Sequence, residues 1–213
     1  GLFVTKLLSR LFKASQPDAL LDLSDEQLVQ QCRSAREGDT RAFEELVRRY
    51  EARVRANCRY LSGSEEDSWD LAQEVLMRAY RAIGRFEQQA LFRTWLWRVK
   101  ANHCLNYLER RRVREREEIV PNSAPAISGY PSGARGPAEA AVAADTAARV
   151  RMALDALPDA IRVPLVLRDL DGMSYPEIAE QLNISVPAAK MRLSRARQEF
   201  RRLYAGSLGD LAP

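Results

Sequence analysis

The chain has 213 residues, enough for one large domain or two small ones, and 46% of them are hydrophobic, so well-packed cores can form. Its 33 lysines and arginines exceed its 29 acidic residues, and the resulting net charge of +4 is unevenly distributed. The chain has an odd number of cysteines, no apolar run of transmembrane length and no signal-peptide pattern, so we expect a cytoplasmic protein.

Residues 1–23 are predicted to be an N-terminal extension that begins with an amphipathic helix over GLFVTKLLSRLFK. On a helical wheel the bulky apolar side chains lie on one half, and Lys6, Arg10 and Lys13 lie on the other. Burying each large apolar side chain is worth roughly 1.5–3 kcal/mol, so this face needs a cover. The cover is the first domain of this chain, an inhibitor protein or an anionic membrane. We favour contact with protein, with membrane contact only indirect or weak.

Residues 24–112 show helical periodicity almost throughout and are predicted to form the first domain. Ser24 and Gln27 form a capping box at the first helix. Turn residues separate it from a second helix, from a third helix over DLAQEVLMRAYRAI, and from a last helix that runs from about Leu91 to Arg112.

Two clusters of opposite charge lie in this part of the chain. Residues 65–74 contain five acidic residues and no lysine or arginine, whereas residues 93–116 contain eight basic and two acidic residues. On the wheel of the acidic helix one face is apolar, and the other collects Asp70, Gln73, Glu74, Met77 and Arg81. This face is either a solvated surface or a docking site for a basic protein, and its methionine favours docking.

Residues 113–145 are predicted to be a flexible linker, because four prolines up to Pro137 and three glycines interrupt any helix. The proline- and glycine-rich part of this segment has about 25 residues and spans at most on the order of 80 Å, which allows two domains to occupy separate sites. Residues 205–213 are predicted to be a C-terminal tail. His103 and Cys104 are neighbours and make a poor chelate, so we predict no metal and no cofactor.

Residues 146–204 are helical again, with short helices joined by DGM and NIS, a spacing that is typical of a helix-turn-helix. The last helix begins at Ser185, which can cap it, and carries Pro187 in its first turn. Opposite its core stripe lie Lys190, Met191, Ser194 and Arg195, with Arg192 and Arg197 at the two borders. A helix that binds DNA needs base-contacting side chains in the middle and cations on the flanks, so DNA binding is favoured over a purely structural helix pair.

Taken together, these segments resemble the extracytoplasmic-function (ECF) sigma factors, small two-domain bacterial transcription initiation factors. The resemblance covers about residues 24–112 and 146–204. It is carried, in this order, by GDTRAFEELVRRY, DLAQEVLMRAYRAIGRF, TWLWRVKANHCLNYLERRR, LDALPDAIRVPLVLRDLDGMSYPEIAEQLNIS and AAKMRLSRAR. It implies an all-α fold of two small helical domains and a protein that is not an enzyme, because RNA polymerase carries out the chemistry.

The resemblance also assigns roles to residues. The helix with DLAQE would dock on the β′ clamp helices of core RNA polymerase through Asp70, Gln73, Glu74, Met77 and Arg81. The −10 promoter element would be bound by Arg78, Phe86, Glu87, Gln88, Trp97, Asn102, Asn106, Arg110, Arg111 and Arg112, although Trp97 could equally be a core residue. The −35 element would be contacted at its bases by Lys190, Met191, Ser194 and Arg195, and at its phosphates by Arg192 and Arg197. A cognate anti-sigma factor is a further expected partner.

The chain departs from the family pattern at two DNA-facing segments. The loop EQQA replaces a form like RGDS, and VPAAKMRL replaces VGTVKSRL, so the recognised bases are expected to differ. Two other functions remain open from the sequence. The first is a free-standing helix-turn-helix regulator, which would leave the acidic helix without a role. The second is a peripheral membrane protein that is anchored through residues 1–20.

Overall fold

The structure, a computed structural model, describes residues 20–36, 38–117 and 137–209. In these ranges the ordered elements are helices and no strand occurs, which confirms the predicted all-α class. The described residues form two compact units. The first contains the residues up to Cys58 together with Ser68–Cys104, and the second contains Arg59–Asp67 and the residues from Leu105 on. The first 19 residues of the predicted extension, residues 118–136 of the predicted linker and residues 210–213 of the tail lie outside the described residues.

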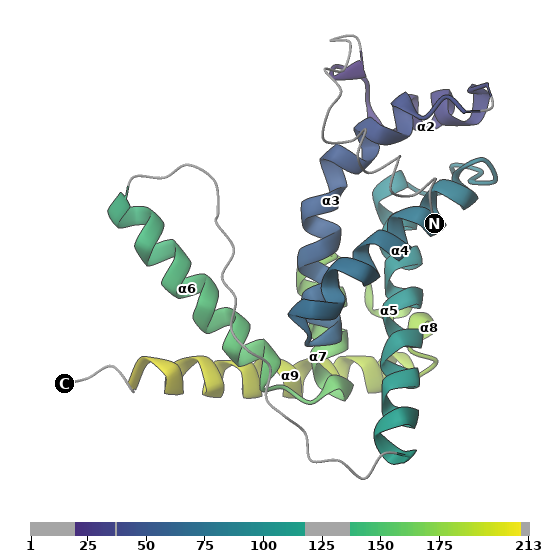
Figure 1. Ribbon diagram of the computed structural model, residues 1–213. Helices are drawn as coiled ribbons and strands as arrows, with labels where there is room; N and C mark the ends of the chain where they lie inside the picture. Colours follow the sequence, from purple (N-terminus) through teal and green to yellow (C-terminus); the bar gives the residue numbers. More distant parts are fainter. Residues whose placement is uncertain (1–19, 37, 118–136, 210–213) are drawn as a thin grey trace. The chain divides into compact units, whose positions relative to one another are not determined.

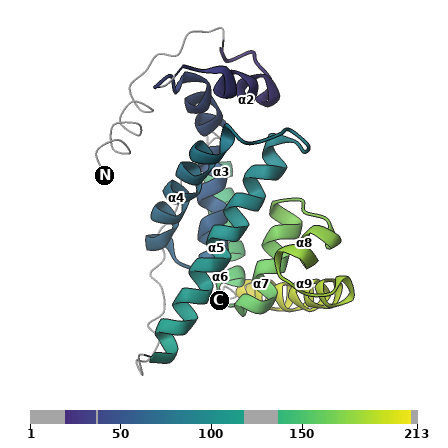
Figure 2. The same ribbon diagram turned by 90° about the vertical axis from the view of Figure 1, so that its right-hand side faces the viewer.

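The first unit is built from four helices, α2 (Asp25–Ser34), α3 (Arg41–Ser62), α4 (Glu65–Ile83) and α5 (Phe92–Glu117), the last three of which continue into the second unit. Figures 1 and 2 show α3, α4 and α5 side by side. Aromatic contacts hold them together. Phe43 of α3 packs on Tyr80 of α4 with ring centroids 5.1 Å apart, and Tyr50 of α3 meets Trp97 of α5 edge-on at 5.9 Å.

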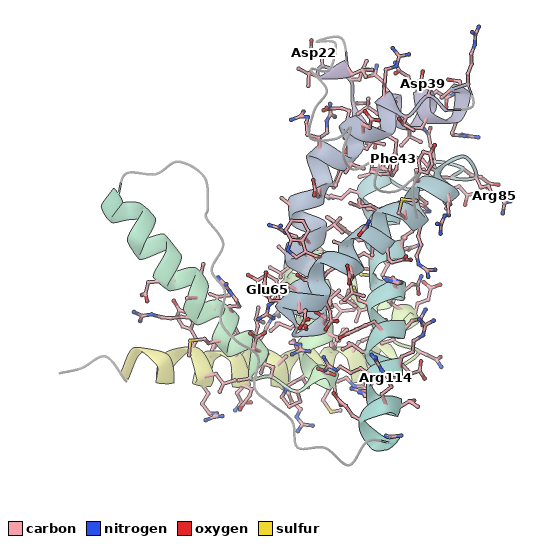
Figure 3. The ribbon with its side chains drawn as sticks, viewed as in Figure 1. Asp22, Asp39, Phe43, Glu65, Arg85 and Arg114 are labelled. Atoms are coloured by element: carbon pink, nitrogen blue, oxygen red, sulfur yellow. The ribbon has the colours of Figure 1, made fainter. Side chains whose placement is uncertain are left out.

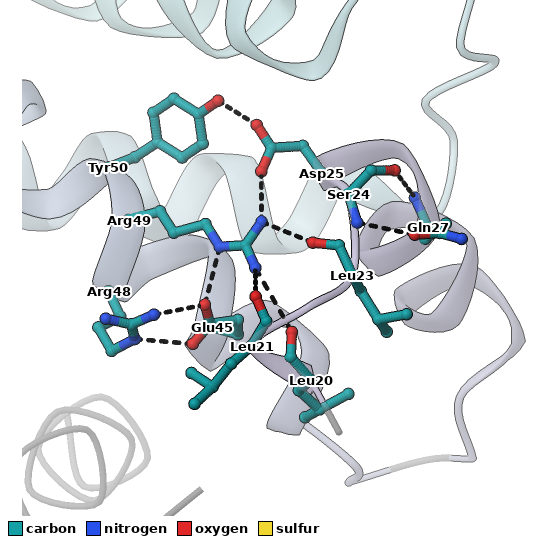
Figure 4. Close-up of polar contacts among 10 residues, drawn as sticks. All are labelled: Leu20, Leu21, Leu23, Ser24, Asp25, Gln27, Glu45, Arg48, Arg49 and Tyr50. Carbon is teal, nitrogen blue, oxygen red and sulfur yellow. Dashed lines mark hydrogen bonds and ion pairs between the residues drawn. The ribbon is translucent and has the colours of Figure 1, made fainter. Parts of the chain in front are cut away.

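A polar network attaches the first described residues to α3 (Figure 4). The Arg49 guanidinium donates hydrogen bonds to the carbonyl oxygens of Leu23 at 2.8 Å and Leu21 at 2.9 Å, and to the carboxylate of Asp25 at 3.0 Å. It also pairs with Glu45 at 2.7 Å, a carboxylate whose side chain is fully buried. The predicted capping box is present, since Ser24 and Gln27 bond to each other's backbone amides. This network attaches the start of α2 to α3.

The second unit contains α6 (Pro137–Asp155), α7 (Asp159–Leu165), the π-helix η2 (Val166–Leu170), α8 (Tyr175–Gln181) and α9 (Val186–Gly209). α9 contacts α6, α7 and α8, and its residues Ala189, Leu193 and Ala196 are buried in the core of this unit. Pro164 lies inside α7, and the change to π-helix follows it within two residues. Figure 2 shows α8 and α9 next to α7.

Two arginines attach the end of α3 to α6 and α7 within this unit. The side chain of Arg59 is only 8% exposed and makes two hydrogen bonds to the carboxylate of Asp155, at 2.7 and 2.6 Å. Arg162 donates to the Leu61 carbonyl oxygen at 3.3 Å, and a Cβ at Gly63 would lie 2.7 Å from its guanidinium. Gly63 also has a φ of +72°, so glycine is required at this turn for two reasons.

The helices on either side of the predicted linker, residues 113–145, both extend into it. α5 continues to Glu117, and α6 begins at Pro137. A proline is compatible with the first position of a helix, because the amide that it lacks would have no helical partner there.

Candidate functional site

α4 presents carboxylates outward, but not all five of its acidic residues. Glu65 pairs with Arg59 at 3.0 Å, and Asp67 accepts a hydrogen bond from the Tyr107 hydroxyl at 2.6 Å. Burial raises the pKa of Asp67, but hydrogen bonds from Ser64 and Tyr107 outweigh it, and the net shift is downward. The outward acids are therefore Glu66, Asp70 and Glu74.

The rest of the predicted α4 face is mixed. Gln73 is half-buried and Arg81 is exposed, as a surface site requires. Glu74 lies 3.7 Å from Arg78 of the next turn, so a residue assigned to polymerase and one assigned to DNA are ion-paired. Met77 is 9% exposed, which contradicts the expectation that its side chain projects from this face.

The loop before α5 has an unusual backbone. Gln88 has a φ of +57°, and its side-chain amide donates to the Glu26 carbonyl oxygen at 3.2 Å, which ties the loop to α2. Gln89 donates to the Glu87 carboxylate at 2.9 Å, and the Leu91 side chain is 58% exposed. The loop is thus attached to α2 through the Gln88 side chain and exposes the apolar side chain of Leu91 directly before α5.

Two aromatic residues assigned to DNA lie in the core instead. Phe86 is 8% exposed and stacks on Trp95 with ring centroids 4.8 Å apart. Trp97 is 1% exposed, and the ammonium group of the buried Lys100 lies 4.6 Å from its ring centroid. Neither Phe86 nor Trp97 can stack on a base in this conformation, so their assignment to the DNA surface is corrected to a packing role.

The outer face of α5 carries a polar and basic stripe. Its exposed members follow each other at four-residue intervals and are Arg98, Asn102, Asn106 and Arg110. The sequence interpretation missed Arg98, although its position one turn before Asn102 could have identified it. Figure 3 labels Arg114 near the end of the same helix, and its side chain is exposed.

Arg111 differs from the other arginines of this run. It donates to the Ser62 carbonyl oxygen at 2.6 Å and lies 3.4 Å from the carboxylate of Asp159. Its guanidinium is therefore engaged within the protein, which is a correction to its predicted phosphate contact. Arg112 is about half exposed and only 3.8 Å from Asp159, so it keeps one side toward solvent.

The helix-turn-helix has the expected local structure. Ser174 and Glu177 form a capping box at α8, Ile178 and Ala179 are buried, and Asn183 takes a φ of +50° in the turn. The Ser185 hydroxyl then accepts a hydrogen bond from the Ala188 amide at 3.3 Å at the start of α9.

The exposed face of α9 matches the division expected from the wheel. The four central residues are exposed: Lys190, Met191, Ser194 and Arg195. The border residues Arg192 and Arg197 are half-buried. Arg197 pairs with Asp169 at 2.6 Å, and this hydrogen bond raises the pKa of its guanidinium.

The sequence interpretation also missed the role of Tyr175 at the start of α8. The ammonium group of Lys190 lies 5.6 Å from the Tyr175 ring centroid, and the Arg168 guanidinium lies 4.9 Å from it. Tyr175 therefore brings cations from two elements together beside α9. No pattern in the sequence relates these three positions, because the packing of α8 on α9 brings them together.

Other kinds of site find no support within the described ranges. There, no three side chains among His, Cys, Asp and Glu are grouped as metal ligands would be. Within the same part of the chain, no helix has the length and apolar character needed to span a bilayer.

Comparison with known proteins identifies the fold. Residues 46–114 match the family Sigma-70 region 2, and residues 147–200 match Sigma-70, region 4. The chain is 30% identical over 177 residues to the RNA polymerase sigma-H factor of Pseudomonas aeruginosa, covering 82% of this chain and 90% of that protein. It is 32% identical over 182 residues to the ECF RNA polymerase sigma-E factor of Escherichia coli, covering 83% and 92%. The chain belongs to the ECF family of RNA polymerase sigma factors.

Two solved structures are similar as well. CnrH, solved in complex with the cytosolic domain of CnrY, is 29% identical, with a TM-score of 0.53 over 85% of this chain and 97% of CnrH. RpoE of Bartonella quintana, solved with the anti-sigma factor NepR, has the same fold, with a TM-score of 0.58, 24% identity, and coverage of 76% and 95%. This sigma factor is thus a promoter-specific transcription initiation factor that acts with RNA polymerase, and neither matched family is catalytic.

Proposed function

We propose that this ECF sigma factor divides polymerase binding and promoter recognition among three helices. α4 docks on the β′ clamp helices of core RNA polymerase, through Asp70 and Glu74 with Gln73 and Arg81 beside them. α5 and the preceding loop bind the −10 element, in a domain that spans about residues 24–112. α9 binds the −35 element in the domain at 146–204. The site of action is the cytoplasm.

The observation that carries this proposal is the separation of charge between exposed helix faces. α4 exposes three carboxylates, whereas the outer faces of α5 and α9 expose cations and amides. The carboxylates suit a basic protein partner, and the cations suit a phosphate backbone.

The −10 surface is proposed to consist of the stripe Asn102, Asn106 and Arg110, with Arg98 added to it, and of the loop from Glu87 to Leu91. Bases of an opened strand need an apolar contact, and Leu91 can supply it in place of the buried Phe86 and Trp97. On α9, Lys190, Met191, Ser194 and Arg195 contact base edges, and Arg192 and Arg197 contact phosphates.

An anti-sigma factor is the further partner that we propose. RpoE was solved with the anti-sigma factor NepR and CnrH with the cytosolic domain of CnrY, and both resemble this chain in fold. The N-terminal amphipathic segment is one candidate contact for such a protein.

The polymerase contact is tested by reversing charge on α4. We expect the double variant Asp70→Arg with Glu74→Arg to lose co-purification with core polymerase while the thermal unfolding midpoint stays close to that of the wild type. Both side chains are exposed, and surface substitutions change stability by only about 0.5 kcal/mol. The matched control reverses Glu109 on α5, which is also exposed. Wild-type yields of holoenzyme from the double variant would show that α4 does not dock there.

A further inference from the structure

Trp69 is an exposed tryptophan at the start of α4. Its side chain is 50% exposed, although tryptophan is among the residues that bury the most apolar surface in proteins. The other two tryptophans behave differently, since Trp95 is half-buried and Trp97 is 1% exposed. Nothing in the helix-forming pattern of α4 requires an aromatic residue at this position.

The Trp69 ring is nevertheless held in place. The guanidinium carbon of Arg55, on α3, lies 3.9 Å from the centroid of the ring, within the range of a cation–π contact. One ring face is therefore covered by an arginine of the same chain. Because the side chain is still half exposed, the ring remains available to another molecule in a fixed orientation, at a reduced entropy cost on binding.

The position of Trp69 connects it to the acidic face of α4. Trp69 directly precedes Asp70, lies one turn after Glu66 and one turn before Gln73. Both acids are exposed and Gln73 is half-buried. The ring therefore borders the surface that we assign to polymerase, at the side where α3 adjoins α4.

We propose that Trp69, oriented by Arg55, is an aromatic anchor of the polymerase-docking surface and extends that surface from α4 onto α3. The inference rests on the proposed docking of α4. The acids attract a basic helical surface, and the exposed part of the ring receives the guanidinium or the alkyl stem of an arginine or lysine from it. Tryptophan and arginine are enriched among the residues that dominate binding energy at protein interfaces.

The test is the dissociation constant of the full chain for core polymerase, measured with a fluorescent label on the chain. Truncating an interface hot spot costs at least about 2 kcal/mol, so Trp69→Ala should weaken binding by roughly 30-fold. Trp69→Phe should recover most of that loss, because the ring is retained. Met152→Ala is the matched control, since Met152 is an exposed apolar residue, 51% accessible, on α6, which is not part of the proposed docking surface.

Arg55 distinguishes an oriented anchor from a merely apolar surface residue. Arg55→Ala should weaken binding by a smaller factor, and should have no further effect in a chain that already carries Trp69→Ala. Circular dichroism melting of each variant monitors folding, and Trp69→Phe keeps the test valid if Trp69→Ala is unstable.

The outcomes separate this inference from the function on which it rests. If Trp69→Ala and Trp69→Phe bind polymerase like the wild type while the Asp70 and Glu74 charge reversals abolish binding, Trp69 is not an anchor and the docking surface stands. If the charge reversals leave binding intact, the proposed docking fails and the role of Trp69 fails with it. An effect of Trp69→Ala confined to binding of an anti-sigma factor also overturns the inference.

Discussion

Arg197 and Asp169 form an exposed ion pair at the border of the −35 surface, with both side chains about 40% accessible. Exposed pairs contribute only about 0–1 kcal/mol, so a DNA phosphate can replace Asp169 at little cost. Arg195, by contrast, lies in the middle of the exposed face of α9, where a side chain is expected to contact base edges and not phosphates. The two arginines are therefore expected to differ in what their removal does.

Arg195→Ala should reduce discrimination at one base pair of the −35 element by roughly 1–3 kcal/mol. Arg197→Ala should instead weaken binding to all promoters to a similar extent and reduce the salt dependence. Promoter-library binding at two salt concentrations measures both effects. Asp169→Asn is the matched control and should strengthen binding uniformly. A sequence-independent loss from Arg195→Ala would remove Arg195 from the base-contacting set.

Trp97 provides a second comparison at the scale of one side chain. The ring is buried against Tyr50, and its indole N–H is buried without a hydrogen-bond partner. Trp97→Ala should therefore lower the free energy of unfolding by about 3–5 kcal/mol. Trp97→Phe should cost much less, because it removes the unsatisfied donor along with part of the ring.

This packing role is checked by two measurements. Urea unfolding gives the free energy of unfolding of both Trp97 variants, and a promoter-opening assay is then carried out with Trp97→Phe. Trp97→Phe should open promoters like the wild type. A variant that folds normally but fails to open promoters would return Trp97 to the DNA surface.

Among the elements, the buried and exposed faces could be predicted from the sequence for α9, but only in part for α5. In α9 the small and apolar residues repeat on one face only, so the wheel separated Ala189 and Leu193 from Lys190 and Arg195. In α5, aromatic and basic residues occur around the whole helix. The burial of Trp97 and Lys100 depends on packing against α3, as the contact between Tyr50 and Trp97 illustrates, and no local pattern reports it.

The attachment of α2 to α3 depends on charge and should respond to pH. Hydrogen bonds from Arg48 lower the pKa of Glu45, and those from Arg49 add to this against the effect of burial. A carboxylate with a lowered folded-state pKa stabilises the fold above its unfolded pKa, here 4.5, and loses that contribution as the pH falls through the folded value.

We therefore expect the thermal midpoint to fall as the pH is lowered below about 4.5, and we expect Glu45→Gln to reduce this decline. Melting curves across this pH range measure it. An unchanged pH dependence in Glu45→Gln would mean that other carboxylates determine the acid sensitivity.

The two capping boxes allow a matched test of α8. Ser24 and Ser174 each accept a hydrogen bond from a backbone amide of the helix that follows. Replacing either with alanine should cost about 0.5–2 kcal/mol of stability. Only Ser174→Ala should weaken binding to −35 DNA, because α8 supports α9. Equal DNA affinities for the two variants would show that the start of α8 does not affect the DNA surface.

At the scale of the whole molecule, the order of the helices and the all-α class followed from the sequence, because the periodic segments are long and separated by clear turn residues. The division into units did not. The α3–α4 turn joins the unit that contains α7, through contacts such as Arg59 with Asp155 and Arg162 with the Leu61 carbonyl oxygen. These pairs are about 100 residues apart in sequence, and their formation depends on tertiary packing.

The central claim is that one chain recognises two promoter elements with two different surfaces. The most direct measurement is transcription from a library of random promoters by core polymerase with this sigma factor, sequenced for wild type, Asn102→Ala and Met191→Ala. We predict two enriched sequence blocks, with Met191→Ala changing base preference only in the upstream block and Asn102→Ala only in the downstream one. A single enriched block, or both variants altering the same block, would contradict the account.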